Sequence, residues 1–320
     1  MRVSQSNWFQ LAFRLRGSVI PAIALRTLFC GLIGVVVSGC YAYGIPVSFP
    51  LNNFIPELVL GLLLVFRTNT AYERYWEGRR LWGQMINSVR NLARQIWIIV
   101  LERDKRDRDH KTSMLRLLVA FAVAVKLHLR KLPPDDELRR LMKRENFDRL
   151  TGMNNPPLEI AFWIGDYLQF QHQRDRLDLY QLTSMQQILN ELVDILGGCE
   201  RILKTPIPPA YSIHLKQLLM LYCFTLPFQV VSTFEWWTGV VMIVVSFTLL
   251  GIEEIGVEIE DPFGLDPNDL PLDEICKTML INISDLMMLS PCTSPDAPIK
   301  TGIPGVNPYQ ESTDDSGIYS

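Results

Sequence analysis

The stretch FIPELVLGLLLVFRTNTAYERYWEGRRLWGQ, residues 54–84, decides the fold, because an apolar run passes into a charged and aromatic run without a break. Its apolar part, residues 54–66, contains Glu57 and falls short of the roughly 20 residues that cross a bilayer core. It can cross a membrane only if the helix continues past Arg67 and faces protein or water instead of lipid. Apolar residues then recur every three to four positions from Trp82 to Trp97. We therefore expect one amphipathic helix continuous with the apolar run.

Three further apolar runs are long enough, or nearly long enough, to span a bilayer on their own. They are residues 22–44, 211–231 and 234–251. Arg26 and Lys216 lie inside two of these runs, and charges in such places usually pair at protein contacts. The last two runs are separated by a short turn before Trp236 and Trp237, which predicts a helical hairpin with this tryptophan pair at the membrane interface. Together with residues 54–66, the runs predict an integral membrane protein with four spans.

The composition excludes several function classes. Of 320 residues, 48% are hydrophobic and 20% are charged, so apolar spans alternate with charged stretches, and the net charge of -3 does not favour nucleic acid. The sequence contains no glycine-rich nucleotide motif, no HExxH and no GxSxG. Its four histidines and six cysteines lack ligand spacing. The chain is therefore interpreted as a non-enzyme with no resident cofactor.

The charged parts of the chain predict further helices and an orientation. Twelve basic residues lie between Arg67 and Arg116, which places this region and the amino terminus on the cytoplasmic side and the loop at 45–53 outside. Both termini are then cytosolic. Amphipathic patterns predict helices at 112–130, 135–147, 158–169 and 177–203. No strand-like alternation occurs, and the chain from Ser290 onward has the composition of a disordered or wrapping tail.

These features divide an all-α chain into four segments. Residues 1–66 hold the amino terminus and the first two spans, and residues 67–209 form a cytosolic helical region. Residues 210–256 hold the third and fourth spans, and residues 257–320 form an acidic cytosolic segment with its tail.

One face of the second span carries a stripe of large apolar residues. Leu58, Leu62 and Phe66 follow one another at intervals of four residues, so they lie on one side of a helix. Two readings remain open from spacing alone: a face toward lipid or the protein core, or one contribution to a narrow hydrophobic ring made by several copies. Pro56 near the helix start is typical of a helix amino terminus, whose free N–H groups favour an anion.

Three separated motifs resemble the bestrophin family, especially its prokaryotic and plastid branch. They are FRTNTAYERYWEGRRLWGQ (66–84), GGCERILKTPIPPAYSIHL (197–215) and IEDPFGLDPNDLPLDEIC (259–276). With the four-span layout, the resemblance covers nearly all of residues 1–290. It implies a homopentamer in the lipid bilayer around one axial pore.

The resemblance also implies site residues. Anchored on Arg74, Tyr75 and Trp76, the hydrophobic neck of the family falls on Leu58, Leu62 and Phe66. A second, cytosolic aperture is implied in the helix around residues 182–192. The candidates for it are Thr183, Met185 and Leu189.

The acidic segment departs from the family pattern. Animal bestrophins carry a dense acidic cluster that helps to bind Ca²⁺, whereas here Asp266, Asp269 and Asp273 are diluted by other residues. Ca²⁺ takes six to eight oxygen ligands. These three aspartates are the candidate ligands if Ca²⁺ binds, and the alternative is that they cap helices and face solvent.

The expected function is a passive channel for chloride and other small monovalent anions. One alternative is a channel selective for monovalent cations, which the acidic residues 253–261 favour if they line the inner vestibule. Another is a non-conducting scaffold, in which the basic region 67–116 docks on anionic lipid or an acidic partner. The plastid-like motifs without a transit peptide indicate a bacterial membrane, with a cyanobacterial cell or thylakoid membrane as the specific expectation.

Overall fold

The computed structural model of this protein describes residues 14–15, 17–48 and 55–291, and all regular elements in these ranges are helices. The predicted all-α class is therefore confirmed. The chain forms two compact units. Unit 1 takes residues up to 85 together with 125–133 and 194–274, and unit 2 takes 86–124, 134–193 and the residues from 275. The charged segment 67–209 is thus shared between the units.

Residues 55–84 of the quoted stretch form part of α3 (Ile55–Ile99), a single helix of 45 residues. The predicted continuity between the second apolar run and the charged run is confirmed. Its first 31 residues, 55–85, belong to unit 1.

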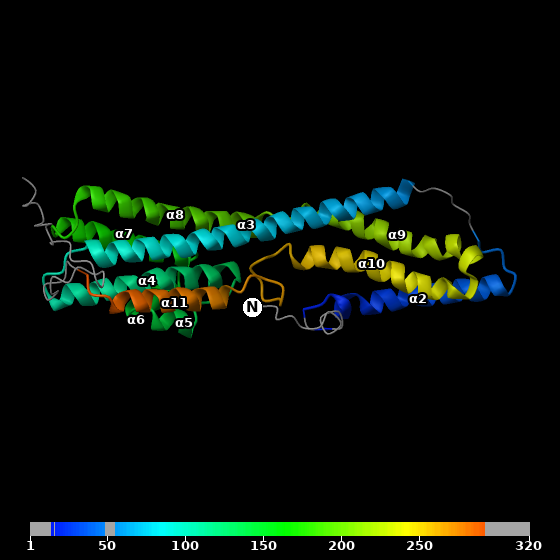
Figure 1. Cartoon of the computed structure of the whole chain (residues 1–320), viewed down its shortest axis with the longest axis horizontal. Coiled ribbons are helices and arrows are strands. Elements are labelled where there is room, and N and C mark those ends of the chain that lie inside the picture. Colours follow the sequence, from blue (N-terminus) through cyan, green and yellow to red (C-terminus); the bar gives the residue numbers. More distant parts are fainter. Residues whose placement is uncertain (1–13, 16, 49–54, 292–320) are drawn as a thin grey trace, which may run out of the picture. The chain divides into compact units, whose positions relative to one another are not determined.

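In unit 1, α2 (Ile20–Ala42), α9 (Pro209–Phe234) and α10 (Thr238–Glu258) lie side by side (Figure 1). A short 3₁₀ turn, η1 (Glu235–Trp237), joins α9 to α10, so the predicted hairpin has the tryptophan pair at its tip. Helices α2 and α10 approach closely at glycines. A Cβ atom added to Gly34 would lie 2.9 Å from the Cα atom of Gly239, closer than real contacts allow. Small residues at such positions are typical of helix pairs in membranes.

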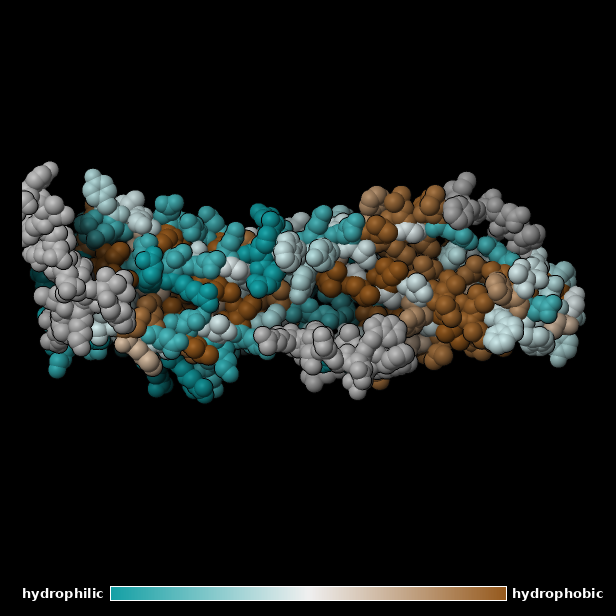
Figure 2. All heavy atoms as spheres, viewed as in Figure 1, coloured by the Kyte–Doolittle hydropathy of each residue, from teal (hydrophilic) through white to brown (hydrophobic). Residues whose placement is uncertain are grey.

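The apolar helices of this unit leave much of their surface uncovered. Of the described residues, α2 and the α9–α10 hairpin are long and apolar enough to cross a membrane, and only 33% and 28% of their most apolar windows are buried. Hydrophobic residues gather over these helices and the first turns of α3 in Figure 2. The apolar part of α3 does not meet this criterion, as its shortness led us to expect. Lipid is the medium that such exposed apolar helices require.

A third helix with a membrane-like composition is α4 (Lys105–Leu129), but 78% of its apolar window is buried inside the protein. It begins earlier than the predicted helix at 112–130. Lys111, in its part within unit 2, is fully buried. Its Nζ donates to Glu102 Oε1 at 2.8 Å and to the Trp97 carbonyl at 3.0 Å. Burial lowers the pKa of Lys111, and the Glu102 carboxylate opposes that shift.

Unit 2 also contains α7 (Pro156–Gln173), with α8 (Leu179–Lys204) and α11 (Leu272–Met288) shared between the two units. The single helix predicted at 135–147 is wrong. Two short helices replace it, α5 (Asp136–Arg140) and α6 (Arg144–Leu150). The break has a packing reason: Leu138, Leu141 and Leu150 are all buried, whereas one continuous helix would place Leu150 on the side opposite Leu141. The predicted tail lies outside the described residues from 292 onward.

Candidate pore-lining helix

The stripe Leu58, Leu62 and Phe66 lies on a face of α3 that the rest of the described chain leaves uncovered. Their exposed fractions are 61%, 52% and 54%. Leu60 and Leu64 on the other side are only 4% and 3% exposed, because they pack against Leu215 and Leu219 of α9. The isolated chain therefore has an apolar helix face available for contacts with lipid or with further copies.

Polar contacts fix α3 directly beyond this stripe. Arg67 is buried and its Nη2 donates to Glu260 Oε2 at 2.5 Å, while Glu260 Oε1 accepts the Ile207 N–H at 3.0 Å. The guanidinium of Arg74 donates to three backbone carbonyls, those of Glu260, Thr205 and Ile202. Such planar guanidinium groups hold several acceptors in fixed positions. The position of the stripe in unit 1 is therefore defined by a network and not by apolar packing alone.

This network joins the three motifs that were separate in the sequence. Arg67 and Arg74 come from the first motif, residues 202–207 from the second, and Glu260 from the third. The Asp-Pro-Phe-Gly segment also reaches α3, since a Cβ atom added to Gly78 would lie 3.0 Å from Pro262 and 3.1 Å from Phe263. Spacing along the chain did not reveal these contacts, although their residues all lie inside the quoted motifs.

Charges near the membrane spans have partners within the same chain. Arg26 Nη1 lies 3.1 Å from Glu254 Oε2, and Lys216 Nζ lies 3.8 Å from Glu253 Oε1. Glu258 accepts a hydrogen bond from Asn268 Nδ2 at 2.6 Å. With Glu260 bound to Arg67, the four glutamates in 253–261 each have a partner, so they do not form a free acidic surface.

The candidate aperture residues in α8 do not share one environment. Met185 is fully buried and Leu189 is 5% exposed, while Thr183 is exposed. Leu182, Met185, Leu189 and Leu192 form the core-facing side of this helix. Met185 and Leu189 are thus buried within the single chain and Thr183 is not, which favours Thr183, and the aperture residue stays a prediction.

Two of the three candidate Ca²⁺ ligands, Asp273 and Asp269, have surroundings in the folded chain that disfavour a cation, and calcium binding stays a prediction. Asp273 accepts hydrogen bonds from Lys126 Nζ and Arg130 Nη1, both at 2.8 Å, and two cations beside it oppose a third. Burial acts to raise the pKa of Asp273, but these hydrogen bonds hold it below its usual value. Burial, with the nearby carboxylates of Asp266 and Asp261, raises the pKa of Asp269 to about 6. No group of three or more possible metal ligands occurs in the part of the chain that the structure describes.

Comparison with known proteins decides the family. The model of the bacterial and fungal bestrophin proteins matches residues 1–285. The chain is a bestrophin. The resemblance carried by the three motifs is thereby confirmed, as is the interpretation that the chain is not an enzyme.

Relatives of this bestrophin come from cyanobacteria and other bacteria. It is 63% identical to a voltage-dependent anion channel-forming protein of Nostoc sp. strain PCC 7120, over 91% of this chain and 95% of that protein. It is 53% identical to a protein of the same description from Synechocystis sp. strain PCC 6803, over 89% and 93%. The crystal structure of a bacterial bestrophin homologue from Klebsiella pneumoniae is similar at a TM-score of 0.77 and 30% identity, covering 84% of this chain and all of that one. The membrane location is therefore established.

Proposed function

We propose that this bestrophin forms a homopentameric channel that conducts chloride and other small monovalent anions passively. The observation that carries the proposal is the uncovered apolar face of α3, with Leu58, Leu62 and Phe66 more than half exposed beside a buried opposite face. Five such faces around one axis would make a narrow hydrophobic neck, which passes ions when it is wetted. The names of the cyanobacterial and enterobacterial relatives, which describe anion channel formation, support the same function.

Anion selectivity has two supports. The amino terminus of α3 begins at Ile55, ahead of the neck residues, and a helix amino terminus carries a partial positive charge. The cation-selective alternative needed the carboxylates of 253–261 as a free acidic lining. In the structure Glu253, Glu254 and Glu260 are each close to a lysine or arginine of the same chain, which compensates their charge. The proposal therefore favours anions over cations.

The scaffold alternative is weakened by the partners of the basic region. Lys111 is buried against Glu102 at 2.8 Å, and Arg67 is buried with its Nη2 2.5 Å from Glu260 Oε2. Part of the charge in residues 67–116 therefore serves internal pairing. We further propose that the membrane is a cyanobacterial cell or thylakoid membrane with both chain termini in the cytosol, from the close relatives and the positive-inside rule.

The deciding experiment is the reversal potential of purified protein in a planar bilayer with a KCl gradient. A value near the chloride equilibrium potential supports the proposal. A value near the potassium potential would reject anion selectivity, and the absence of current above empty bilayers would favour the scaffold. Native mass spectrometry of the same sample measures the subunit number.

The neck is tested by Leu62→Ala and Phe66→Ala. Shortening either side chain should widen or wet the constriction and raise the open probability several-fold in single-channel recordings. Leu32→Ala in α2 is the matched control, because Leu32 is similarly exposed (59%) but outside α3. If both neck variants gate like wild type, the gate lies elsewhere.

A further inference from the structure

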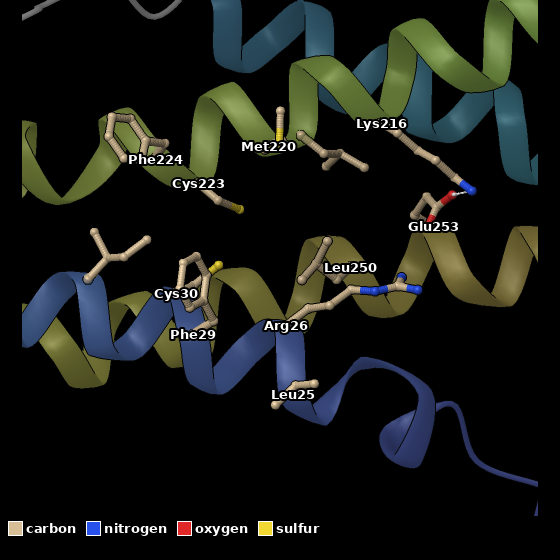
Figure 3. A pocket seen from close by; sticks show the side chains of 12 residues that line it. Leu25, Arg26, Phe29, Cys30, Lys216, Met220, Cys223, Phe224, Leu250 and Glu253 are labelled. Carbon is tan, nitrogen blue, oxygen red and sulfur yellow. Dashed lines mark ion pairs between the residues drawn. The ribbon is translucent and has the colours of Figure 1, made fainter.

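A cavity of about 640 Å³ opens between α2, α9 and α10 of unit 1 (Figure 3). Its walls are apolar side chains, among them Phe29 and Ile33 of α2, Met220 and Phe224 of α9, and Leu250 of α10. Met220 and Phe224 are largely exposed at its rim. Since these helices lie in the membrane-spanning part of the chain, the medium that reaches the cavity is hydrocarbon and not water.

One end of the cavity is charged. Arg26, Lys216 and Glu253 line it together, as Figure 3 shows on the side away from Phe224. Arg26 is six residues from the start of α2, Lys216 is seven from the start of α9, and Glu253 is five from the end of α10. At 1.5 Å per residue these positions lie roughly 8–11 Å inside the helix ends. The charged end therefore lies at one level of the bundle, where long cationic side chains reach toward lipid headgroups.

The cations at this end keep donors for a ligand. The side chains of Arg26 and Lys216 are 56% and 59% exposed, whereas those of Glu254 and Glu253 are 16% and 4% exposed. The 3.8 Å separation of Lys216 Nζ from Glu253 Oε1 is beyond hydrogen-bond distance. Arg26 places one Nη1 contact on Glu254 and has further N–H groups. The outward surface of the charged end is thus cationic, with the carboxylates beneath it.

The cavity extends from this end into the apolar bundle. From Arg26 to Ile33 along α2 is seven residues, or about 10 Å of helix. A cationic end followed by an apolar groove along the helices complements a phosphate followed by a hydrocarbon chain. Basic pockets between membrane helices are known to bind anionic lipid headgroups.

We propose that this cavity is a binding site for one glycerophospholipid, with an acyl chain along Phe29, Met220 and Phe224 and the phosphate between Arg26 and Lys216. The lipid fills a space that the helices of one chain leave open. The site is separate from the α3 stripe and does not rest on the proposed channel function, since it requires only that the bundle lies in a membrane.

The test measures phospholipid bound to full-length protein by native mass spectrometry, after detergent purification and titration with phosphatidylglycerol. Arg26→Gln/Lys216→Gln should bind the lipid roughly tenfold or more weakly, since each cation near a lipid headgroup contributes on the order of 1 kcal/mol. Arg79→Gln/Arg80→Gln, which removes two exposed cations outside the cavity, is the matched control and should bind like wild type. Met220→Trp, at a rim position that tolerates a larger side chain, should displace the acyl chain without touching either cation.

Two cysteines provide an internal readout of the same site. Cys30 and Cys223 line the cavity, so added phospholipid should slow their labelling by a lipid-soluble maleimide, as located by peptide mapping. If the Arg26→Gln/Lys216→Gln variant binds the lipid as tightly as wild type, the headgroup assignment is overturned. If the Arg79→Gln/Arg80→Gln control loses as much lipid affinity as that variant, the effect is a nonspecific one of charge and the site is overturned as well. Retention of free fatty acid alone would reject a phospholipid.

Discussion

Helices α2 and α4 have similar lengths, and each contains a window apolar enough to cross a membrane, yet they lie in different surroundings. The apolar window of α4 is 78% buried inside the protein, and that of α2 is 33% buried. The flanking charges differ as well: α4 begins within a run of charged residues and buries Lys111 beside Glu102, whereas Arg26 of α2 stays largely exposed. Hydropathy measures how apolar a segment is, but it does not say whether protein or lipid covers it. Helix α4 is therefore a helix of the protein core, whereas α2 is a helix of the membrane-facing surface.

The largest expected effect that tests this difference comes from shortening one phenylalanine in each helix. Phe121 of α4 is fully buried and Phe29 of α2 is 62% exposed. Phe121→Ala should cost about 3–5 kcal/mol of unfolding free energy because it leaves a cavity. Phe29→Ala should cost less than about 1 kcal/mol, because no packed core surrounds it. Thermal unfolding in one detergent measures both variants, and equal losses would contradict the assignment of α4 as a core helix.

Ion pairs sharpen the same difference. Glu102→Gln leaves Lys111 buried without its counter-ion and should lower the free energy of unfolding by about 3 kcal/mol. This value is at the lower end for buried ion pairs because the glutamine amide oxygen still accepts a hydrogen bond. Glu254→Gln should change stability by less than about 1 kcal/mol, since Arg26 remains exposed. If the double variant Glu102→Gln/Lys111→Met does not recover part of the loss, the cost has another origin than the unpaired lysine.

Polar contacts should hold α3 in addition to the packing of Leu60 and Leu64 on α9. Arg74→Lys replaces a guanidinium that donates to three carbonyls by a single ammonium group, and it should lower the free energy of unfolding by about 2 kcal/mol. The control is Arg79→Lys, at an exposed position on the same helix. Equal melting temperatures for the two variants would show that the network contributes little.

The smallest effect on stability is expected at the carboxyl group of Asp269, whose pKa is set by its surroundings. The pKa of Asp269 is about 6 in the folded chain against 3.8 as its ordinary value. Its contribution to stability is therefore full below pH 4 and is lost as the pH rises through 6. Asp269→Asn should remove this loss and raise stability at pH 7.5 by less than about 1 kcal/mol, because solvent screens a partly exposed group. Melting curves from pH 4 to pH 8 measure it. Parallel profiles for variant and wild type would exclude Asp269 as the titrating group.

Several elements followed from local patterns, while others did not. The continuity of α3 and the α9–α10 hairpin were predictable because each depends on unbroken apolar or amphipathic runs. The split of 135–147 into α5 and α6 was not, because it accompanies the burial of three leucines, and burial is not recorded in local spacing. The burial of Met185 and Leu189 was not predictable for the same reason: an apolar side chain in an amphipathic helix has the same spacing whether it faces a core or an aperture.

The sequence by itself determined the all-α class, the apolar runs, the family and the stripe of Leu58, Leu62 and Phe66, because periodicity and motif order are properties of neighbouring residues. Only the tertiary structure decided that this stripe is uncovered while Leu60 and Leu64 pack on α9. It also decided that Arg26, Asn268 and Arg67 bind three of the glutamates after Gly251, and that Lys216 lies 3.8 Å from the fourth, Glu253. The physical reason is that burial and charge pairing depend on residues far apart in the sequence, such as Arg26 and Glu254 at a separation of 228 positions, which no local pattern records.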